Sequence, residues 1–371
     1  MTQQKEPFKM FTAGPVNVSD AVKKSLIYPE IGHRETEFSG IYHSVREKIL
    51  KAFAVDARDY SSFVIGGSGT SAMESVLTAN IHNGRKMLVI NNGAFGDRMA
   101  EICAIYKTPL VKANYQWGEY PKIDGIEALI AHEPEIEAVS MVFMETSTGM
   151  VNPVREIGEL CKKYNKMFIV DAVSGFAGDS LNIKESNVDF CFSNTNKGLS
   201  GLPVISFVCA KRDSIEQVRD VPIRNYYLNM LKYHDYAEKS NETPFTPQIP
   251  LFYMFNQALD ELLGEGVDNR IARYRENSLL MRKMLSDLRF KFQLPEEQMS
   301  NVMTNVLMPR NYSYEEFHLP LKERGYIIYP GKGRLEGKNM HVGNIGINTT
   351  REVSEFCDSV ANIVEKRKAE Y

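Results

Sequence analysis

The sequence is poor in cysteine and lacks any long apolar run. Its five cysteines show no Cys-x-x-Cys spacing, and none of its seven histidines has a spacing such as His-Glu-x-x-His, so we expect no disulfides and no metal. The cysteines are expected to be small core residues. No run reaches the roughly 18 to 20 apolar residues that span a bilayer, and the polar residues 1–6 lead into no apolar leader. We therefore expect a cytoplasmic protein with no membrane partner.

The chain also lacks an excess of charge of either sign. Lysine and arginine number 44 against 47 aspartates and glutamates, which leaves a formal net charge of −3. Proteins that bind polyanions usually carry a basic surplus, so we expect no nucleic-acid partner. The composition, with 43% hydrophobic and 25% charged residues, is typical of an ordinary globular protein. Small molecules are the expected ligands.

Short β-rich runs alternate with helical patterns over the first 211 residues. Such alternation predicts an α/β fold with a mostly parallel, seven-stranded sheet and helices on both of its faces. In a sheet of this kind, ligands bind at the carboxyl ends of the strands. The expected strands are 63–66, 86–92, 108–115, 138–145, 166–173, 189–194 and 204–211.

The pattern changes after about residue 212. Segment 241–250 (NETPFTPQIP) holds three prolines and predicts an irregular connection, followed by a helix from 251 to 263 that continues after 264–266 into 267–288. The remainder predicts a smaller α+β domain with strands at 300–308, 326–329 and 340–345 and a final helix from Thr350. We expect an N-terminal arm over 1–16, a large domain over 17–258 and a small domain over 259–371.

Two of the expected strand ends carry a lysine and an aspartate. Asp171 closes the strand in 168–172 (FIVDA), and Lys197 follows the next strand in 193–198 (SNTNKG). A lysine can form an imine with the aldehyde of pyridoxal phosphate, and an aspartate can keep the pyridine nitrogen protonated so that the ring withdraws electrons. Alone, the aspartate fits a strand-end cap and the lysine a solvated side chain. Together they indicate a pyridoxal phosphate site.

A glycine-rich loop supports that interpretation. Segment 66–71 (GGSGTS) follows a strand and opens a helical pattern over 72–81. Glycines allow close approach of the backbone, the first helical N–H groups point at a ligand, and the hydroxyls can donate to phosphate oxygens. The alternative is a plain strand-to-helix turn with a Ser or Thr cap. The loop lacks the Gly-Lys-Ser/Thr of a Walker motif.

Three further segments offer candidate ligand contacts. Phe95, in 91–98 (NNGAFGDR), stands where an aromatic ring can stack on a planar cofactor, although a core phenylalanine fits the pattern as well. Segment 145–149 (ETSTG) ends the fourth strand with hydroxyls that can bond the cofactor's ring oxygen, and its alternative is a polar turn. The pair His33-Arg34 fits either an anion contact or a solvated pair.

Taken as a set, these motifs resemble the class V aminotransferases of the fold-type I pyridoxal phosphate enzymes. The resemblance extends over nearly the whole chain. The last two motifs below, together with ETSTG, favour the 2-aminoethylphosphonate branch over the alanine or serine:glyoxylate branch. The motifs are TAGP (12–15), GHR (32–34), GSGT (67–70), NGAFGDR (92–98), ETSTG (145–149), DAVS (171–174), NK (196–197), PFTP (244–247), YPGK (329–332) and GNIG (343–346).

The resemblance implies a role for each candidate residue. Lys197 would form the imine and move the proton, and Asp171 would contact the pyridine nitrogen. The family is dimeric, and the loop carrying Thr246, with Thr243 as the alternative, would reach the neighbouring subunit's phosphate, which implies a homodimer. The other implied cofactor contacts are Ser68, Gly69, Thr70, Phe95, Thr146 and Asn196, and the implied substrate contacts are Gly14, Arg34 and His341.

The implied reaction is ping-pong transfer of the amino group of 2-aminoethylphosphonate, or a close analogue, to pyruvate, giving phosphonoacetaldehyde and alanine. One position departs from the family: His341 stands where an arginine two residues before Gly-x-x-Gly grips the substrate's carboxylate or phosphonate. Histidine lacks the permanent charge and the two-pronged fork of arginine.

The departure at His341 leaves the substrate open. Arg34, Lys332 or Arg334 could supply the missing charge. Alternatives for the activity are an amino acid:glyoxylate aminotransferase and a lyase that eliminates a β-substituent. A catalytically silent scaffold is a third possibility, against which the presence of both Asp171 and Lys197 argues.

Overall fold

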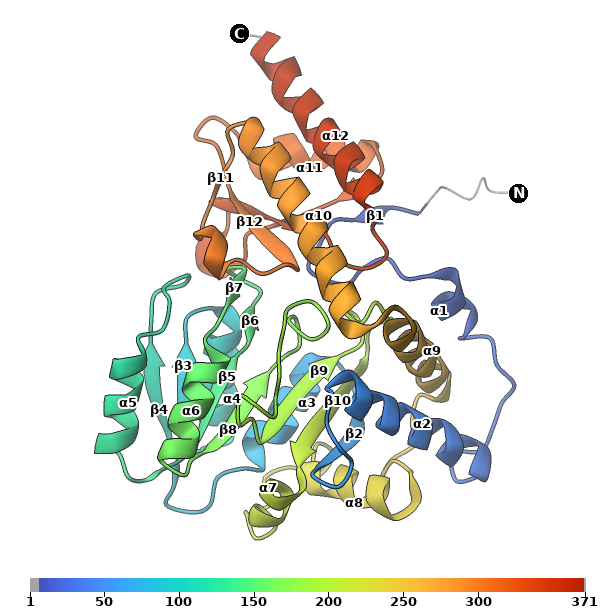
Figure 1. Ribbon diagram of the computed structural model, residues 1–371, viewed down its shortest axis with the longest axis vertical. Coiled ribbons are helices and arrows are strands. Elements are labelled where there is room, and N and C mark those ends of the chain that lie inside the picture. The colour runs from blue at the N-terminus through green and yellow to red at the C-terminus, as the bar shows by residue number, and fades with distance from the viewer. Residues whose placement is uncertain (1–6, 370–371) are drawn as a thin grey trace.

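Seven strands form one mixed sheet in the larger part of the molecule (Figure 1). The structure is a computed structural model that describes residues 7–369. The strand β10 is antiparallel to both of its neighbours, and the other pairs are parallel. The predicted seven-stranded sheet is therefore confirmed, except that the predicted strand 138–145 ends at Val142, and β6 (Met144–Glu145) pairs with β7 (Met150–Val151) in a separate two-stranded sheet. In spatial order its members are β2 (Tyr60–Gly66), β10 (Ile205–Lys211), β9 (Phe190–Asn194), β8 (Met167–Asp171), β5 (Ile136–Val142), β3 (Lys86–Asn91) and β4 (Leu110–Asn114).

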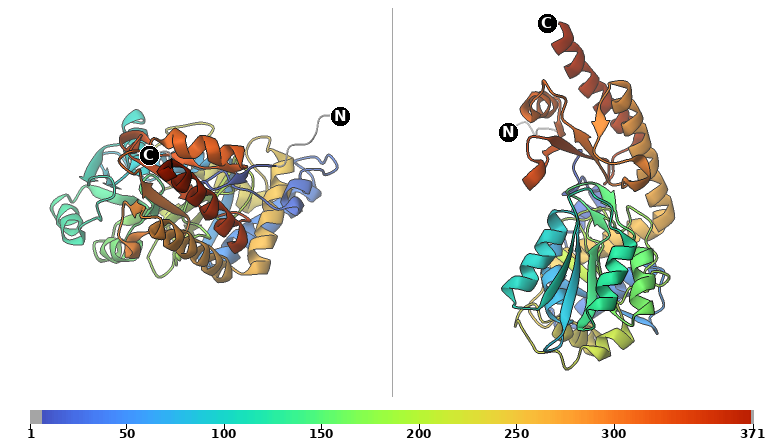
Figure 2. Two further views of the ribbon diagram at one scale, coloured as in Figure 1. Left: turned by 90° about the horizontal axis from the view of Figure 1, so that it is seen from above. Right: turned by 90° about the vertical axis from the view of Figure 1, so that its left-hand side faces the viewer.

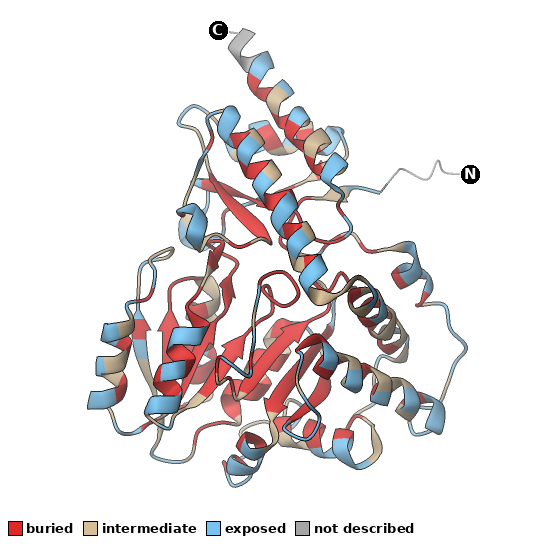
Figure 3. Cartoon of the chain, in the orientation of Figure 1, coloured by how far each residue is buried: buried red, intermediate tan, exposed pale blue. Residues whose placement is uncertain are grey.

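Helices cover both faces of this sheet. Figure 1 shows α2 (Thr36–Ala52) and α6 (Val154–Lys163) in front and α3 (Gly69–Thr78) behind, and Figure 2 shows the sheet from its edge. Central strands are therefore buried along nearly their whole length, as the red ribbons of Figure 3 show, and their sequences are almost continuously apolar. The other helices of this part are α1 (Asp20–Lys24), α4 (Ala94–Ile105), α5 (Ile123–His132), α7 (Arg212–Gln217), α8 (Met230–Ser240) and α9 (Ile249–Glu265).

A smaller antiparallel sheet and three helices form the second part, above the large sheet in Figure 1. The expected continuation of α9 is a separate helix, α10 (Val267–Asp287), because Gly266 takes a φ of +87° that ends the first helix. The sheet consists of β11 (Lys291–Phe292), β12 (Met303–Leu307), β15 (Asn339–Gly343) and β14 (Tyr329–Pro330), and it packs with α11 (Tyr314–Glu323) and α12 (Thr350–Ala369).

The two parts have separate hydrophobic cores. The smaller core includes Met281 and Leu285 of α10 and also Phe11, whose ring stacks on Phe356 at 4.1 Å. Strand β1 (Lys9–Met10) pairs in parallel with β13 (Tyr326–Ile327), so the start of the described chain joins the second part. The domain boundary between residues 258 and 259 stays a prediction. The polar segment 1–6 lies outside the described residues.

All five cysteines are buried and free, which confirms their expected place in the core. Within residues 7–369, no helix is both long and apolar enough to cross a membrane. The same part of the chain contains no group of three His, Cys, Asp or Glu side chains placed to hold a metal.

Candidate active site

Asp171 lies buried at the carboxyl end of β8, between β5 and β9. It is 2% exposed, and the N–H of Val173 donates to its Oδ1 at 2.7 Å. Burial raises the pKa of Asp171 to about 7, and the Val173 N–H and the charges of Arg98 and Lys197 oppose that rise. A cation placed against this carboxylate would be strongly favoured, because it would compensate a buried charge.

Lys197 follows β9, the strand next to that of Asp171. Its Nζ donates to the carbonyl oxygen of Ala13 at 2.6 Å. Burial lowers the pKa of Lys197 to about 8, so a useful fraction of the amine is uncharged near neutral pH. A Cβ added to Gly14 would lie 2.5 Å from Lys197 Cδ, and the φ of Gly14 is +118°. Glycine at position 14 therefore gives the lysine its room.

The loop 66–71 has the form of a phosphate cradle. Ser68 occupies the N-cap position of α3, but its side chain makes no capping hydrogen bond. The alternative, a strand-to-helix turn in which a serine hydroxyl caps the helix, therefore does not describe this loop. Gly67 has a φ of +140°, and a Cβ on Gly69 would lie 2.7 Å from Val173 Cγ2. Thr70 Oγ1 accepts from Arg98 Nη1 at 2.9 Å, which brings a cation to the cradle.

Glu145 holds the N-terminus of α4, where Phe95 lies. Its Oε2 accepts from the N–H groups of Phe95 at 3.1 Å and Gly96 at 3.3 Å, and Ser147 Oγ accepts from Ala94 N–H at 2.9 Å. Burial raises the pKa of Glu145, and these hydrogen bonds oppose the rise. A carboxylate at a helix N-terminus is favourable because it meets unpaired N–H groups.

The sequence reading missed Glu145 and Arg98. The guanidinium carbon of Arg98 lies 4.6 Å from the centroid of the Phe95 ring. The sequence feature that pointed to Arg98 was its spacing from Phe95: residues 95 and 98 are three apart on one helix and are therefore neighbours on its surface. The signal for Glu145 was an acidic residue at the end of a buried strand, but its target lies 50 residues earlier in the chain.

Thr146 and Asn196 lie at the same edge of the sheet. The hydroxyls of Thr146 and Ser174 are 2.5 Å apart, and Asn194 Nδ2 donates to Asn196 Oδ1 at 2.6 Å. Asn194 Oδ1 is buried and has no hydrogen-bond partner among the described residues. The edge therefore presents hydroxyl and amide groups beside Asp171.

Two expected site residues lie apart from this cluster. Arg34 donates to the carbonyl oxygen of Thr243 at 2.9 Å and pairs with Glu242. Thr246 is exposed and makes no hydrogen bond within residues 7–369, whereas the Thr243 hydroxyl donates to the carbonyl oxygen of Phe245 at 2.7 Å. Of the two threonines, only Thr246 has a hydroxyl free for another molecule.

His341 lies in the middle of β15, opposite Asn305 of β12 and Tyr329 of β14. It is 7% exposed, and its Nε2 is buried without a hydrogen-bond partner in the described chain. Burial lowers the pKa of His341 to about 4, a contact with the Ser147 backbone opposes this, and the charges of Lys332 and Lys197 add to it. The ring is therefore neutral at pH 7.

A lysine amine and a buried carboxylate at adjacent strand ends of this sheet, with a glycine-rich cradle, define a pyridoxal phosphate enzyme of fold type I. The chain belongs to the class V aminotransferase family, which matches residues 12–333, and is a pyridoxal phosphate-dependent aminotransferase.

Curated relatives span almost the whole chain. The 2-aminoethylphosphonate–pyruvate transaminase of Lysinibacillus sphaericus is 32% identical, with 96% of this chain and 97% of that protein covered. A protein of the same name from Syntrophobacter fumaroxidans is 35% identical, with 92% of each chain covered. Among solved structures, alanine–glyoxylate aminotransferase from Nostoc sp. superposes with a TM-score of 0.90 at 24% identity, covering 99% of this chain and 96% of that one, and supports the fold.

The residues present fit pyridoxal phosphate. Asp171 is a buried carboxylate without a cationic hydrogen-bond partner in the described chain, which suits a protonated pyridine nitrogen. The free Ser68 hydroxyl suits a phosphate, and the unpaired Asn194 Oδ1 leaves one buried acceptor for a ligand. These observations are independent of one another and lie along one edge of the sheet.

Proposed function

We propose that this aminotransferase moves the amino group of 2-aminoethylphosphonate, or a close analogue, to pyruvate, giving phosphonoacetaldehyde and alanine by a ping-pong mechanism. The curated relatives of that name support the proposal. The structural observation that carries it is the positive charge beside the site. Arg98 and Lys332 lie 4.6 and 5.5 Å from the Phe95 ring, and neither forms an ion pair with a carboxylate of the described residues.

The proposed contacts follow from the geometry of the edge. Asp171 would hold the pyridine nitrogen, and Phe95, oriented through Glu145, would stack on the ring. The phosphate would lie in the cradle, close to the charge of Arg98. The remaining proposed contacts are Ser68, Gly69 and Thr70 with the phosphate, Thr146 with the ring hydroxyl and Asn196 on the phosphate side.

Lys197 would carry the proton in each half-reaction. Bound pyridoxal phosphate supplies an electron-withdrawing ring that stabilises negative charge on the substrate's amine-bearing carbon. As a free amine, Lys197 would take the proton from that carbon, acting as a general base. The protonated amine would then act as the general acid. Its pKa, lowered to about 8 by burial, places the amine near the range in which a general base works at physiological pH. Gly14 would leave room for the side chain to move.

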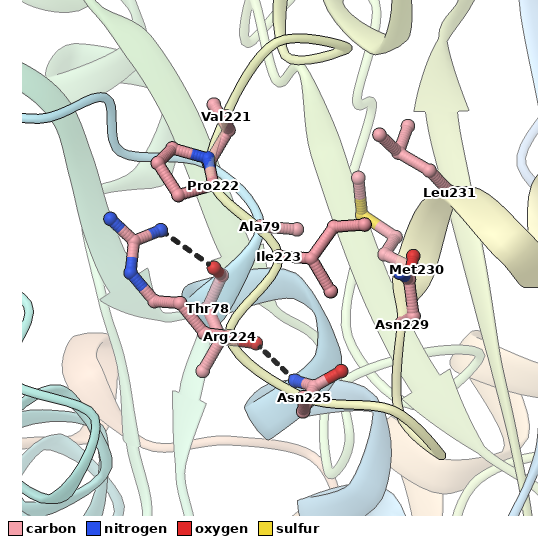
Figure 4. Close-up of a pocket in the computed structure, with 10 residues that line it drawn as sticks. All are labelled: Thr78, Ala79, Val221, Pro222, Ile223, Arg224, Asn225, Asn229, Met230 and Leu231. Carbon is pink, nitrogen blue, oxygen red and sulfur yellow. Dashed lines mark hydrogen bonds between the residues drawn. The ribbon is translucent and has the colours of Figure 1, made fainter.

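A homodimer is part of the proposal, with Thr246 reaching the partner's phosphate. The support is an aromatic patch beside the loop that carries Thr246. Ile223 and Tyr226 are each 76% exposed, and Tyr227 stacks on Phe245 of that loop at 4.8 Å. Such exposed apolar side chains are typical of an interface. Figure 4 shows how Arg224 and Asn225 tie this segment to Thr78 at the end of α3.

Sedimentation of Ile223→Glu and of Tyr226→Glu tests the dimer. Charge on a covered apolar surface should produce monomers, whereas Ile105→Glu, at a residue 68% exposed on α4, should leave the oligomeric state as it is. A monomeric wild-type protein, or dimers of both patch variants, would contradict the proposal.

A screen of donors and acceptors tests the activity. Alanine should accumulate from 2-aminoethylphosphonate and pyruvate together, and from neither alone, and each half-reaction should change the cofactor's visible absorption by itself. Faster turnover of amino acids with glyoxylate would favour that alternative. Ammonia release without a keto acid would indicate a lyase. Absence of any turnover in a protein that carries cofactor would favour the silent scaffold.

A further inference from the structure

Lys332 is the one of three candidate cations that lies beside the Phe95 ring of the site. Arg34 is held by Glu242 and the carbonyl oxygen of Thr243. The guanidinium of Arg334 lies 5.6 Å from the Trp117 ring. Lys332 has no carboxylate partner within residues 7–369, and its only ring contact there is with Phe95. Arg34 is therefore held by an ion pair, and Arg334 lies beside Trp117 rather than beside Phe95.

The backbone on either side of Lys332 is held in place. A Cβ on Gly331 would overlap Asn339 Oδ1 and the carbonyl oxygen of Leu335, so this glycine packs tightly against its own loop. Gly333 has a φ of +57°, and a Cβ there would lie 3.0 Å from Trp117. The main chain at 332 is thus anchored on both sides, while the Lys332 side chain itself is exposed.

The charge of Lys332 acts on the active site. It contributes to lowering the pKa of both Lys197 and His341, which places it within electrostatic reach of the reacting amine and of the small sheet. Arg98 is closer to the cofactor side, because it donates to Thr70 in the cradle. Lys332, which also lies beside the Phe95 ring, is the cation available for the far end of the substrate.

His341 complements this charge with a neutral hydrogen-bonding group. Its buried, unpaired Nε2 is an uncommon feature, since most buried polar atoms in proteins have a partner. A neutral imidazole can form a hydrogen bond to a ligand without adding charge. Compared with the arginine that the family resemblance implies at this position, the charge and the hydrogen bonding of a guanidinium are here divided between Lys332 and His341.

We propose that Lys332 Nζ binds the anionic group of the substrate, a phosphonate or phosphate at the end of a short amine, and that His341 Nε2 forms a neutral hydrogen bond to the same molecule. This specificity role rests on the proposed function. It replaces a rigid bidentate contact with a mobile point charge, which tolerates variation in the length and shape of the anion.

Steady-state kinetics of Lys332→Met with a series of amines test the proposed contact between Lys332 and the anionic group of the substrate. The change keeps the apolar stem and removes the charge, so kcat/KM for 2-aminoethylphosphonate should fall about 10- to 150-fold, as expected for loss of a charged hydrogen bond, mainly through KM. The value for propylamine, which has no anionic group, should change much less, and only through the effect of the Lys332 charge on the pKa of Lys197. Lys332→Arg should recover most of the loss. The matched control is Lys338→Met, which removes an exposed lysine of the same loop.

Calorimetric titration of ethylphosphonate into the holoenzyme separates this inference from the proposed reaction, because the probe has no amine. It should bind the wild type and Lys338→Met alike and bind Lys332→Met about 10- to 150-fold more weakly. If Lys332→Met binds ethylphosphonate more weakly while the wild type does not transaminate 2-aminoethylphosphonate, the proposed contact of Lys332 is supported and the proposed substrate is wrong. If 2-aminoethylphosphonate reacts, yet Lys332→Met matches the wild type in both assays, the proposed contact of Lys332 with the substrate anion is wrong.

Discussion

The two walls of the active site differ in how completely their polar groups are paired. On the edge of the large sheet, Asp171 accepts from Val173, Thr146 meets Ser174, and Glu145 accepts from two N–H groups of α4, while one buried atom, Asn194 Oδ1, has no partner in the described chain. On the small sheet, buried polar atoms of three residues have no hydrogen-bond partner in the described chain: His341 Nε2, Asn305 Oδ1 and Asn339 Oδ1.

This difference indicates separate roles for the two walls. A buried polar atom without a partner costs about 1–3 kcal/mol, so each such atom beside the site is a candidate for a hydrogen bond to a ligand. Under the proposed function, the wall on the large sheet would hold the cofactor, and the wall on the small sheet would contact the substrate.

The largest expected effect is on the wall on the large sheet, from Lys197→Ala. Removing the amine should lower kcat about 10,000-fold or more with every substrate, since both proton transfer and covalent attachment depend on it. Borohydride should then attach no pyridoxyl group at position 197. Lys184→Ala, at an exposed residue paired with Asp59, is the control and should keep full activity. Appreciable turnover by Lys197→Ala would place the reacting amine elsewhere.

Asp171→Asn should have the next largest effect. The amide cannot compensate a protonated ring nitrogen, so kcat should fall about 100- to 1,000-fold, the usual result of losing one electrostatic contact. The loss should be similar for anionic and neutral amines. Visible spectra of the bound cofactor, recorded against pH, provide the measurement. A loss confined to anionic amines would assign Asp171 to substrate binding and remove the contrast between the walls.

On the wall on the small sheet, His341→Arg should change selectivity rather than chemistry. A permanent charge at this position should raise kcat/KM for pyruvate about tenfold, while the cofactor's spectrum stays the same. Combined with Lys332→Met, the change should restore part of the phosphonate activity that the latter loses. Unaltered constants for every carboxylate and phosphonate would show that position 341 does not face the substrate.

The smallest expected effect concerns the stability of the apoprotein. The pKa of Asp171, raised to about 7 by burial, lies above its ordinary value, so the folded state holds a proton that the unfolded state releases between about pH 4 and 7. Stability contributed by this group therefore falls as pH rises through that window. Asp171→Asn should raise the apoprotein's Tm by about 2–6 °C at pH 8 and much less at pH 4.

Calorimetry of the apoprotein and holoenzyme checks this prediction. Asp189→Asn is the control, and it should destabilise at pH 8, because that carboxylate accepts from Lys211, Ser214 and the Phe168 N–H. Burial also raises the pKa of Asp179, to about 6. In Asp171→Asn, stability should therefore still fall as pH rises, but less steeply. A lower Tm for apo Asp171→Asn at pH 8 would show that the carboxylate is not strained by burial.

Local patterns predicted the elements that depend on neighbouring residues. Strands β3, β5 and β8 were predictable because a buried parallel strand is almost continuously apolar. The cradle at 66–71 was predictable because glycine and hydroxyl residues between a strand and a helix suit a phosphate. The pairing of β1 with β13 was not, since each is two residues long and they lie more than 300 residues apart in the chain.

The sequence by itself determined the class of reaction: Lys197 and Asp171 stand at adjacent strand ends, and the alternation of strands and helices brings such ends to one edge. Tertiary structure alone decided which charges are available there. Arg34 pairs with Glu242, Arg334 lies beside the Trp117 ring, and burial makes His341 neutral, while Lys332 lies beside the Phe95 ring without a carboxylate partner in the described chain. The physical reason is that charge and hydrogen-bonding capacity depend on burial and on partners distant in the chain.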